Sequence, residues 1–303
     1  MKKYRYTAEI TTPSQLERNL AQAEKDIRHM LTHDGREWAH RIKEAKELLT
    51  IIANKHGLKK APSLLSVSIS KLQKDEKVTL GLPLLPATHS GIVNVCAFAD
   101  SCAETCVAFS GNAGFDNVYK SRMAKTHFLN WQPTSFLVLL THEIFRAVDQ
   151  YGAENLAIRL NAYSDIRWEK VYPFLFKLFS NVQFYDYTKH TTKSRPEENR
   201  PANYHLTYSV SEKTTPKIIS ECADIGRPLA VVVEIRSGVK PGTQTMREIP
   251  TTWAGMPTID GDSNDSRYLT PTGSVVLLRR KHTMKANHPM IVKAAKLEKG
   301  VQP

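Results

Sequence analysis

The chain has 303 residues, of which 41% are hydrophobic and 24% charged, and its 42 Lys and Arg exceed its 30 Asp and Glu to give a net charge of +12. This composition excludes an intrinsically disordered protein, a collagen-like repeat and a small disulfide-stabilised domain. No apolar run approaches the roughly 18 residues that cross a bilayer, and the segment MKKYRYTAEITTP lacks the apolar core of a secretory signal, so we expect a cytoplasmic protein without a membrane partner.

The first part of the chain, residues 1–60, predicts an αα-hairpin. Apolar residues recur at helical spacing over 14–33 and again over 36–56. Ser14 is placed to cap the first helix, and Glu17 three residues later would complete a capping box. We expect the hairpin to pack on the main domain rather than to act as an independent nucleic-acid-binding module.

The remainder, residues 61–303, alternates predicted strands with predicted helices, which is typical of parallel strands joined by crossover helices. A complete eight-fold barrel needs about 250 residues, and only about 220 remain once a charged carboxyl-terminal tail is set aside. We therefore expect an α/β fold, specifically a partial or irregular (β/α) barrel. The predicted strands lie at 64–69, 155–161, 181–187, 204–210 and 229–235, and the predicted helices at 118–131, 133–151 and 168–179.

The most informative segment is a cysteine triplet. Three of the four cysteines, Cys96, Cys102 and Cys106, lie within eleven residues, and only Cys222 is elsewhere. Thiolates are soft ligands that suit zinc or an iron–sulfur cluster. Three of them would hold three irons of a [4Fe–4S] cluster and leave the fourth iron open, which is the arrangement that radical S-adenosylmethionine chemistry uses.

Two other interpretations of the triplet stay open. Zinc sites usually have ligand pairs two to four residues apart that recur later in the chain, and no second pair exists here. A zinc-stabilised scaffold would therefore have to recruit Cys222 or a distant histidine such as His89 or His127. The third interpretation is that the cysteines are structural thiols without a metal.

The triplet and its surroundings resemble a phage-encoded radical-SAM-like family of the gene product 88 type. The similar segment runs from Val95 to Leu129, with Ala108, Gly111 and Arg122 after the cysteines. Further similar motifs are Ile158-Arg-Leu-Asn-Ala-Tyr-Ser-Asp165, Phe184-Tyr-Asp-Tyr-Thr-Lys189 and Ile259-Asp-Gly-Asp-Ser-Asn-Asp-Ser-Arg267, so the resemblance covers roughly residues 64–280.

The resemblance implies a [4Fe–4S] cluster on the triplet, S-adenosylmethionine as a second cofactor, and a phage protein in the host cytoplasm. Two positions depart from the family's pattern: Cys106 is followed by Val-Ala instead of Tyr-Ala, and no proline follows Cys96. The aromatic side chain beside the cluster would then come from Phe98 or Phe109. Since the family implies a fold and a cofactor more than a reaction, enzymatic activity stays an open question.

Polar residues at the carboxyl ends of the predicted strands are candidates for binding the second cofactor, because functional groups collect there in (β/α) folds. In a radical-SAM-like site they would bind the ribose and amino-acid parts of S-adenosylmethionine, with Asp165 and Lys189 as the first choices. The complete set of candidates is Asn161, Ser164, Asp165, Tyr187 and Lys189.

The late part of the chain suggests two further features. The acidic run 260–265 lacks the glycine and the closing glutamate of a calcium loop, and we expect an Asx turn with Arg267 pairing one carboxylate. Arg279, Arg280 and Lys281 are candidates for contacts with nucleic acid, which the positive charge favours as a partner. A non-enzymatic nucleic-acid-binding or host-interaction protein on the same fold is therefore the alternative function, and a solvated basic tail is the alternative structure.

Overall fold

A computed structural model describes residues 9–33, 35–67, 77–109, 114–234, 250–280, 284–285 and 287–292. Gly111, Lys281 and most of the basic tail lie outside these residues. No helix among the described residues is both long enough and apolar enough to span a membrane.

The predicted helices agree closely with those of the structure except at one place, and the helix over 216–224 was not predicted. The segment predicted as one helix over 168–179 is divided at Pro173, whose missing N–H and fixed φ allow it to begin a helix but not to continue one. The helices are α1 Pro13–His33, α2 Gly35–Lys55, α3 Asp116–Trp131, α4 Pro133–Tyr151, α5 Trp168–Val171, α6 Pro173–Leu178 and α7 Pro216–Asp224.

The capping box of α1 lies two residues earlier than predicted. The Thr12 backbone N–H donates to Gln15 Oε1 at 2.7 Å, and the Gln15 N–H donates to Thr12 Oγ1 at 3.3 Å. The prediction of Ser14 and Glu17 was wrong because the Glu17 carboxylate instead accepts two hydrogen bonds from Arg167, at 2.8 and 2.5 Å. Glu17 therefore ties α1 to the loop before α5.

Ten strands form one sheet in the order β1-β2-β3-β4-β5-β6-β9-β8-β7, with β10 paired to β6. The pairs β1–β2 and β7–β8 are antiparallel and all the others are parallel. No pairing among the described residues joins β1 to β7, so the sheet is open at both edges. The strands are β1 Ser66–Val67, β2 Val78–Gly81, β3 Leu156–Arg159, β4 Gln183–Thr188, β5 Tyr204–Ser209, β6 Leu229–Val233, β7 Thr252–Trp253, β8 Met256–Asp260, β9 Val275–Arg279 and β10 Ile291–Val292.

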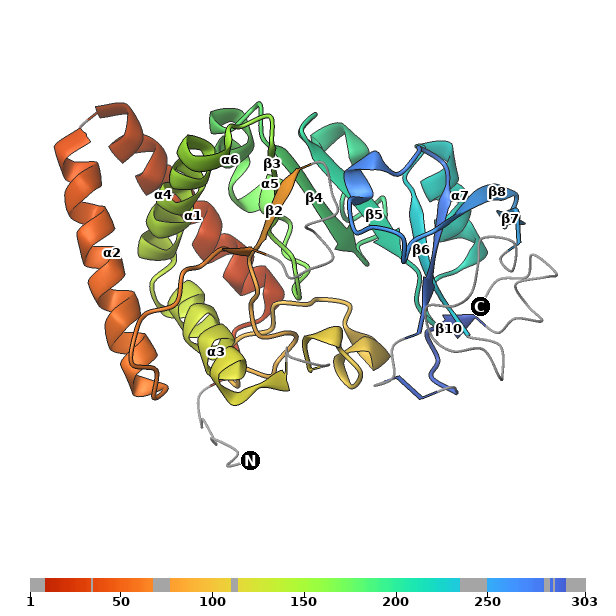
Figure 1. Cartoon of the computed structure of the whole chain (residues 1–303), viewed down its shortest axis with the longest axis horizontal. Helices are drawn as coiled ribbons and strands as arrows, with labels where there is room; N and C mark the ends of the chain where they lie inside the picture. The colour runs from red at the N-terminus through yellow and green to blue at the C-terminus, as the bar shows by residue number, and fades with distance from the viewer. Residues whose placement is uncertain are drawn as a thin grey trace.

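The helices and the sheet share two hydrophobic cores. The larger core joins residues of α1 to α6 to side chains from one face of β2 to β5, among them Leu80, Ile158, Phe184 and Leu206. The smaller core lies between α7 and the strands β5, β6 and β9. Figure 1 shows α2 at the outer end of the molecule and α1 crossing behind α4, both on the opposite side from β6 to β10. The amino-terminal hairpin is thus part of the core that supports the central strands.

A buried histidine pair connects the hairpin to the main fold. His56 Nε2 lies 3.0 Å from His127 Nδ1, and His127 Nε2 lies 3.1 Å from the Ser90 carbonyl oxygen. His127 is fully buried in α3, and its ring packs against Trp131 with centroids 4.5 Å apart. Burial lowers the pKa of His127 to about 4, because the imidazolium would lose its hydration. The native state therefore holds a neutral imidazole.

This neutral imidazole predicts a loss of stability in mild acid. The unfolded chain protonates His127 near pH 6.5 while the folded chain does not, so unfolding takes up a proton between pH 6.5 and about 4. His127→Gln should reduce the pH dependence of the unfolding free energy by about 1.4 kcal/mol per pH unit in this range. Urea unfolding at pH 5, 6 and 7 measures it. His40→Gln on the exposed side of α2 is the control, and an unchanged slope in His127→Gln would contradict the assignment.

Candidate functional site

The cysteine segment crosses the edge of the sheet where the parallel strands end. Cys96 forms an isolated parallel bridge with Asp165, and the Asp165 N–H donates to the Val95 carbonyl oxygen at 2.9 Å. Asp165 follows β3, so the bridge fixes the first cysteine at the carboxyl end of the central strands. Figure 1 shows this gold segment below the arrowheads of β4 and β5. This is the edge at which parallel α/β sheets bind their ligands.

Cys96 lies in a largely enclosed environment. Its Sγ accepts a hydrogen bond from the Ala87 N–H at 3.4 Å and lies 3.5 Å from the Tyr163 carbonyl oxygen. Burial raises the pKa of the Cys96 thiol to about 12, with further contributions from Asp165 and the other two cysteines of the triplet. The other two thiols of the triplet therefore lie near enough to influence the pKa of Cys96.

Cys102 lies in the short 3₁₀ turn Asp100–Ala103, and Cys106 immediately precedes a second 3₁₀ turn, Val107–Phe109. Burial and the neighbouring Cys102 raise the pKa of Cys106 to about 11, while Lys189 and Arg122 oppose the shift because cations favour the thiolate. Arg122 is buried in α3, donates to the Ala108 carbonyl oxygen, and lies over the Tyr163 ring at 4.5 Å. Two positive charges thus accompany the thiols.

Contacts from distant parts of the chain hold the turn between Cys96 and Cys106. The Ser101 N–H donates to Glu212 Oε1 at 3.1 Å, and Lys213 pairs with Asp100 at 2.5 Å. His288 Nε2 lies 3.2 Å from the Ser101 carbonyl oxygen and 3.1 Å from Thr105 Oγ1. The turn is therefore clamped by the loop after β5 and by the segment before β10.

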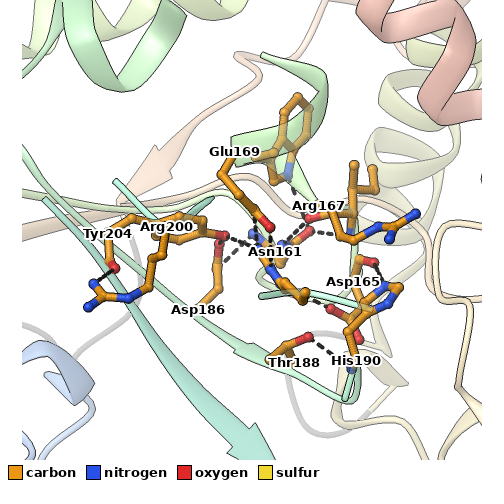
Figure 2. Close-up of polar contacts among 12 residues, drawn as sticks. Asn161, Asp165, Arg167, Glu169, Asp186, Thr188, His190, Arg200 and Tyr204 are labelled. Carbon is orange, nitrogen blue, oxygen red and sulfur yellow. Dashed lines mark hydrogen bonds and ion pairs between the residues drawn. The ribbon is translucent and has the colours of Figure 1, made fainter. Parts of the chain in front are cut away.

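The three candidates that follow β3 organise their own loop. Asn161 Oδ1 accepts hydrogen bonds from Ser164 Oγ and the Ile166 N–H, both at 2.9 Å. Asp165 Oδ2 accepts one from the Lys189 N–H at 2.8 Å, and His190 Nε2 lies 3.2 Å from the Asp165 carbonyl oxygen. Figure 2 shows Asn161, Asp165 and His190 within one network of polar contacts. Asp165 thereby joins the cysteine segment to the end of β4.

The other two candidates, Tyr187 on β4 and Lys189 directly after it, follow the side-chain alternation to the face of the sheet away from the larger core. Tyr187 is half-buried, and the Arg159 guanidinium lies 5.4 Å from its ring centre. Lys189 is also half-buried, and its Nζ donates to Ser209 Oγ on β5 at 3.4 Å. These side chains are bound less completely than those of Asn161, Ser164 and Asp165.

A buried ion pair that no sequence motif indicated supports this edge. Arg195 is 2% exposed and donates to both carboxylate oxygens of Glu169, at 2.7 and 2.6 Å. It also donates to Tyr204 Oη at 2.9 Å and lies 3.5 Å from Asp165 Oδ1. Arg195 therefore connects α5, β5 and the loop after β3.

Tyr204 extends the network to the middle of β4. Its hydroxyl donates to Asp186 Oδ2 at 2.7 Å, and Asp186 Oδ1 accepts from the Asn161 N–H at 2.8 Å, as Figure 2 shows for the labelled residues. Burial raises the pKa of Asp186 to about 7, although Arg159 and the two hydrogen bonds oppose this. The alternation along β4 places Asp186 on the buried face with Phe184. Its partners Tyr204 and Asn161 could not be predicted, because they lie far from Asp186 in the sequence.

The late basic residues are placed differently from the sequence interpretation. Arg279 is 7% exposed and pairs with Asp260 at 2.9 Å and Asp262 at 3.3 Å, so its charge is already neutralised. Arg280 donates to the Met284 carbonyl oxygen at 3.0 Å, and Lys281 lies outside the described residues.

The acidic run forms Asx turns as predicted, through the Asp262 N–H to Asp260 Oδ1 at 3.0 Å and the Ser266 N–H to Asn264 Oδ1 at 3.1 Å. The arginine that pairs with its carboxylates is Arg279. Arg267 instead donates to the carbonyl oxygens of Gly261 and Asn264.

Thiolates are the donors that either a zinc ion or an iron–sulfur cluster would use. Within the described part of the chain, no three His, Cys, Asp or Glu side chains lie close enough to hold one metal ion. A cluster binds each cysteine on a different iron atom, so its ligands stand farther apart than those of a single ion. Cys222, the fourth ligand that zinc would need, is fully buried in the smaller core.

Comparison with known proteins gives one match. A family model described as gene product 88 matches residues 52–296. No curated protein and no solved structure matches.

The Arg195–Glu169 pair predicts a large cost for removing one partner. Arg195→Met leaves a buried carboxylate without its cation and should lower the free energy of unfolding by about 3–5 kcal/mol in urea titrations. Adding Glu169→Gln should recover part of the loss by removing that charge. Arg41→Met, which breaks an exposed pair on α2, should cost less than about 1 kcal/mol. Equal losses at the two arginines would show that the buried pair has no special role.

Proposed function

The chain belongs to the gene product 88 family, and we propose that it holds a [4Fe–4S] cluster on Cys96, Cys102 and Cys106 and acts as a radical S-adenosylmethionine enzyme. The observation that supports the proposal is the position of Cys96 at the carboxyl edge of a parallel sheet, with Cys102 and Cys106 near enough to influence the pKa of its thiol. Three cysteine ligands leave one iron of the cluster for another molecule.

The surroundings of the triplet support this assignment. Lys189 and Arg122 place positive charge near Cys106, which favours the thiolate form that ligation requires. Phe98 packs edge-on against His190 with centroids 4.9 Å apart, and Phe109 packs similarly against His89 at 4.7 Å. These aromatic side chains would shield the cluster region from water, in the place of the missing family tyrosine.

When bound, such a cluster supplies the electron, taken from an external reductant, that cleaves the sulfonium of S-adenosylmethionine. The chain's own residues would bind and orient that cofactor. Lys189 and Tyr187 are the side chains placed to contact it. Asn161, Ser164 and Asp165 would act through the loop that they organise, because their polar atoms already bind backbone and side-chain partners.

The proposal also covers the curvature of the sheet and the class of the substrate. The run of parallel strands from β2 to β8 is the part of the sheet that would curve into a partial (β/α) barrel around the cofactor. The net charge of +12 favours a polyanionic substrate, namely nucleic acid or a nucleotide.

Anaerobic reconstitution with iron and sulfide tests the proposal. The protein should turn brown and carry close to four irons per chain, and S-adenosylmethionine should change the electron paramagnetic resonance spectrum of the reduced protein. Serine at any of the three cysteines should reduce the iron content, because a hydroxyl is a harder and less readily ionised ligand than a thiol.

Cys222→Ala is the matched control and should leave the iron content unchanged, since this thiol lies in the apolar core beside α7. Bound zinc that is lost in Cys222→Ala would identify a zinc-stabilised scaffold instead. A colourless protein without iron or zinc would leave the triplet as structural thiols, and the non-enzymatic alternative would then replace the enzyme.

A further inference from the structure

The face of the central strands that points away from the larger core carries a polar cluster. Side chains alternate along a strand, so the neighbours of the core residues Ile158, Phe184 and Leu206 lie on the opposite face. The strand register aligns Arg159 on β3 with Tyr185 on β4 and His205 on β5 as one row. Tyr187 and Thr207 form the next row toward the carboxyl edge.

Several donors of this cluster have no partner among the described residues. The Thr207 hydroxyl is fully buried and makes no hydrogen bond, and neither does His205 Nε2. Arg159 Nε makes no hydrogen bond to any described residue, and the guanidinium lies 5.5 and 5.4 Å from the ring centres of Tyr185 and Tyr187. A buried donor without a partner costs about 1–3 kcal/mol, so a cluster of them indicates that something else binds there.

The arginine side chains of the cluster favour an anion as the ligand. A second arginine, Arg267, lies across this face in the 3₁₀ turn Arg267–Leu269, is 1% exposed, and has no hydrogen bond at Nε. Both guanidinium groups act electrostatically on Tyr187. Asp265 also acts on Tyr187 and Arg159, but it forms no ion pair with either arginine in the described part of the chain. Asp186 also acts on Arg159 and Asp262 also acts on Tyr187. Asp186 is bound by Tyr204 and the Asn161 N–H, and Asp262 by Arg279, so neither of them occupies the unpartnered Nε atoms of Arg159 and Arg267.

The backbone fixes the second arginine over the sheet. A side chain at Gly261 would lie 2.3 Å from Val276 Cγ1 on β9, so only glycine lets the chain leave β8 this close to the sheet. The Gly261 carbonyl oxygen then accepts a hydrogen bond from Arg267 at 3.1 Å, and the Tyr268 ring packs on Tyr185 with centroids 5.3 Å apart. Arg159, Tyr187 and His205 are only half-buried, so this side of the cluster borders the surface.

We propose that this face binds a phosphate group, with Arg159 as its main ligand and with Arg267, His205 and Thr207 donating further hydrogen bonds. A guanidinium matches the tetrahedral oxyanion with two parallel N–H donors. The site is distinct from the cysteine triplet and requires no metal.

The position of the phosphate site connects it to the triplet. Along the same face, Tyr187 leads to Lys189, and Thr207 leads to Ser209, which bonds to Lys189 beside Cys106. A phosphorylated substrate held by Arg159 would therefore extend toward the cysteines. This orientation, unlike the phosphate site itself, rests on the proposed function.

Inorganic phosphate added to the metal-free protein tests the site. Phosphate should raise the thermal unfolding midpoint in a saturable way, at constant ionic strength and beyond the effect of chloride, because it binds only the native state. Isothermal calorimetry gives the affinity. Arg159→Gln should weaken phosphate binding at least tenfold, and Arg41→Gln on the exposed side of α2 is the charge-matched control.

Thr207→Val distinguishes a binding role from a structural one. Valine replaces an unpartnered hydroxyl with a methyl group of similar shape, so the ligand-free protein should be as stable as the original or more stable, while phosphate affinity falls. Acetate in place of phosphate should bind more weakly; tighter binding of acetate would assign the site to carboxylates and overturn the choice of phosphate. Equal phosphate affinity in the original protein, Arg159→Gln and Thr207→Val, or no effect beyond that of chloride, would exclude the site. These results do not depend on iron.

Discussion

The charge of Arg195 is buried, and the carboxyl edge of the sheet is arranged around the groups that neutralise it. Glu169 meets it through two hydrogen bonds, Tyr204 through one, and Asp165 at 3.5 Å. Because a buried charge without a partner is strongly unfavourable, α5, β5 and the loop after β3 are held at fixed positions relative to one another. Asp165 in turn holds the backbone beside Cys96 and the amide of Lys189, so the geometry of the candidate site depends on this one arginine.

Local sequence patterns predicted most of the helices and the central strands, because these elements carry clear periodicity. The long amphipathic helices α1, α2 and α4 and the apolar strand β6 are of this kind. The patterns did not reveal β2, which has only four residues. They also did not reveal β9, because its apolar run has no alternation that would distinguish a buried strand from a buried helix. At α5 and α6 the apolar pattern continued through Pro173, although the backbone could not.

Some residues of the candidate site could likewise be predicted from the sequence and others could not. The cysteine triplet is visible in the sequence because three rare residues lie close together, whereas the pairs Arg195–Glu169 and Tyr204–Asp186 join residues 26 and 18 positions apart without any motif. Arg279 shows the reverse case. The sequence suggested it as a nucleic-acid contact because its neighbours are basic, and the structure pairs it with Asp260 and Asp262 on the adjacent strand and turn. Only the strand order reveals such partners.

The clamp on the cysteine turn has a consequence for the order in which the protein matures. The ribosome makes Cys96, Cys102 and Cys106 in the first half of the chain, but the residues that hold their turn, Glu212, Lys213 and His288, emerge much later. The turn therefore gains its last described contact only when almost the whole chain has been synthesised. Until then the three thiols lack the contacts that hold their turn, so a cluster of the kind proposed above would be loaded after translation.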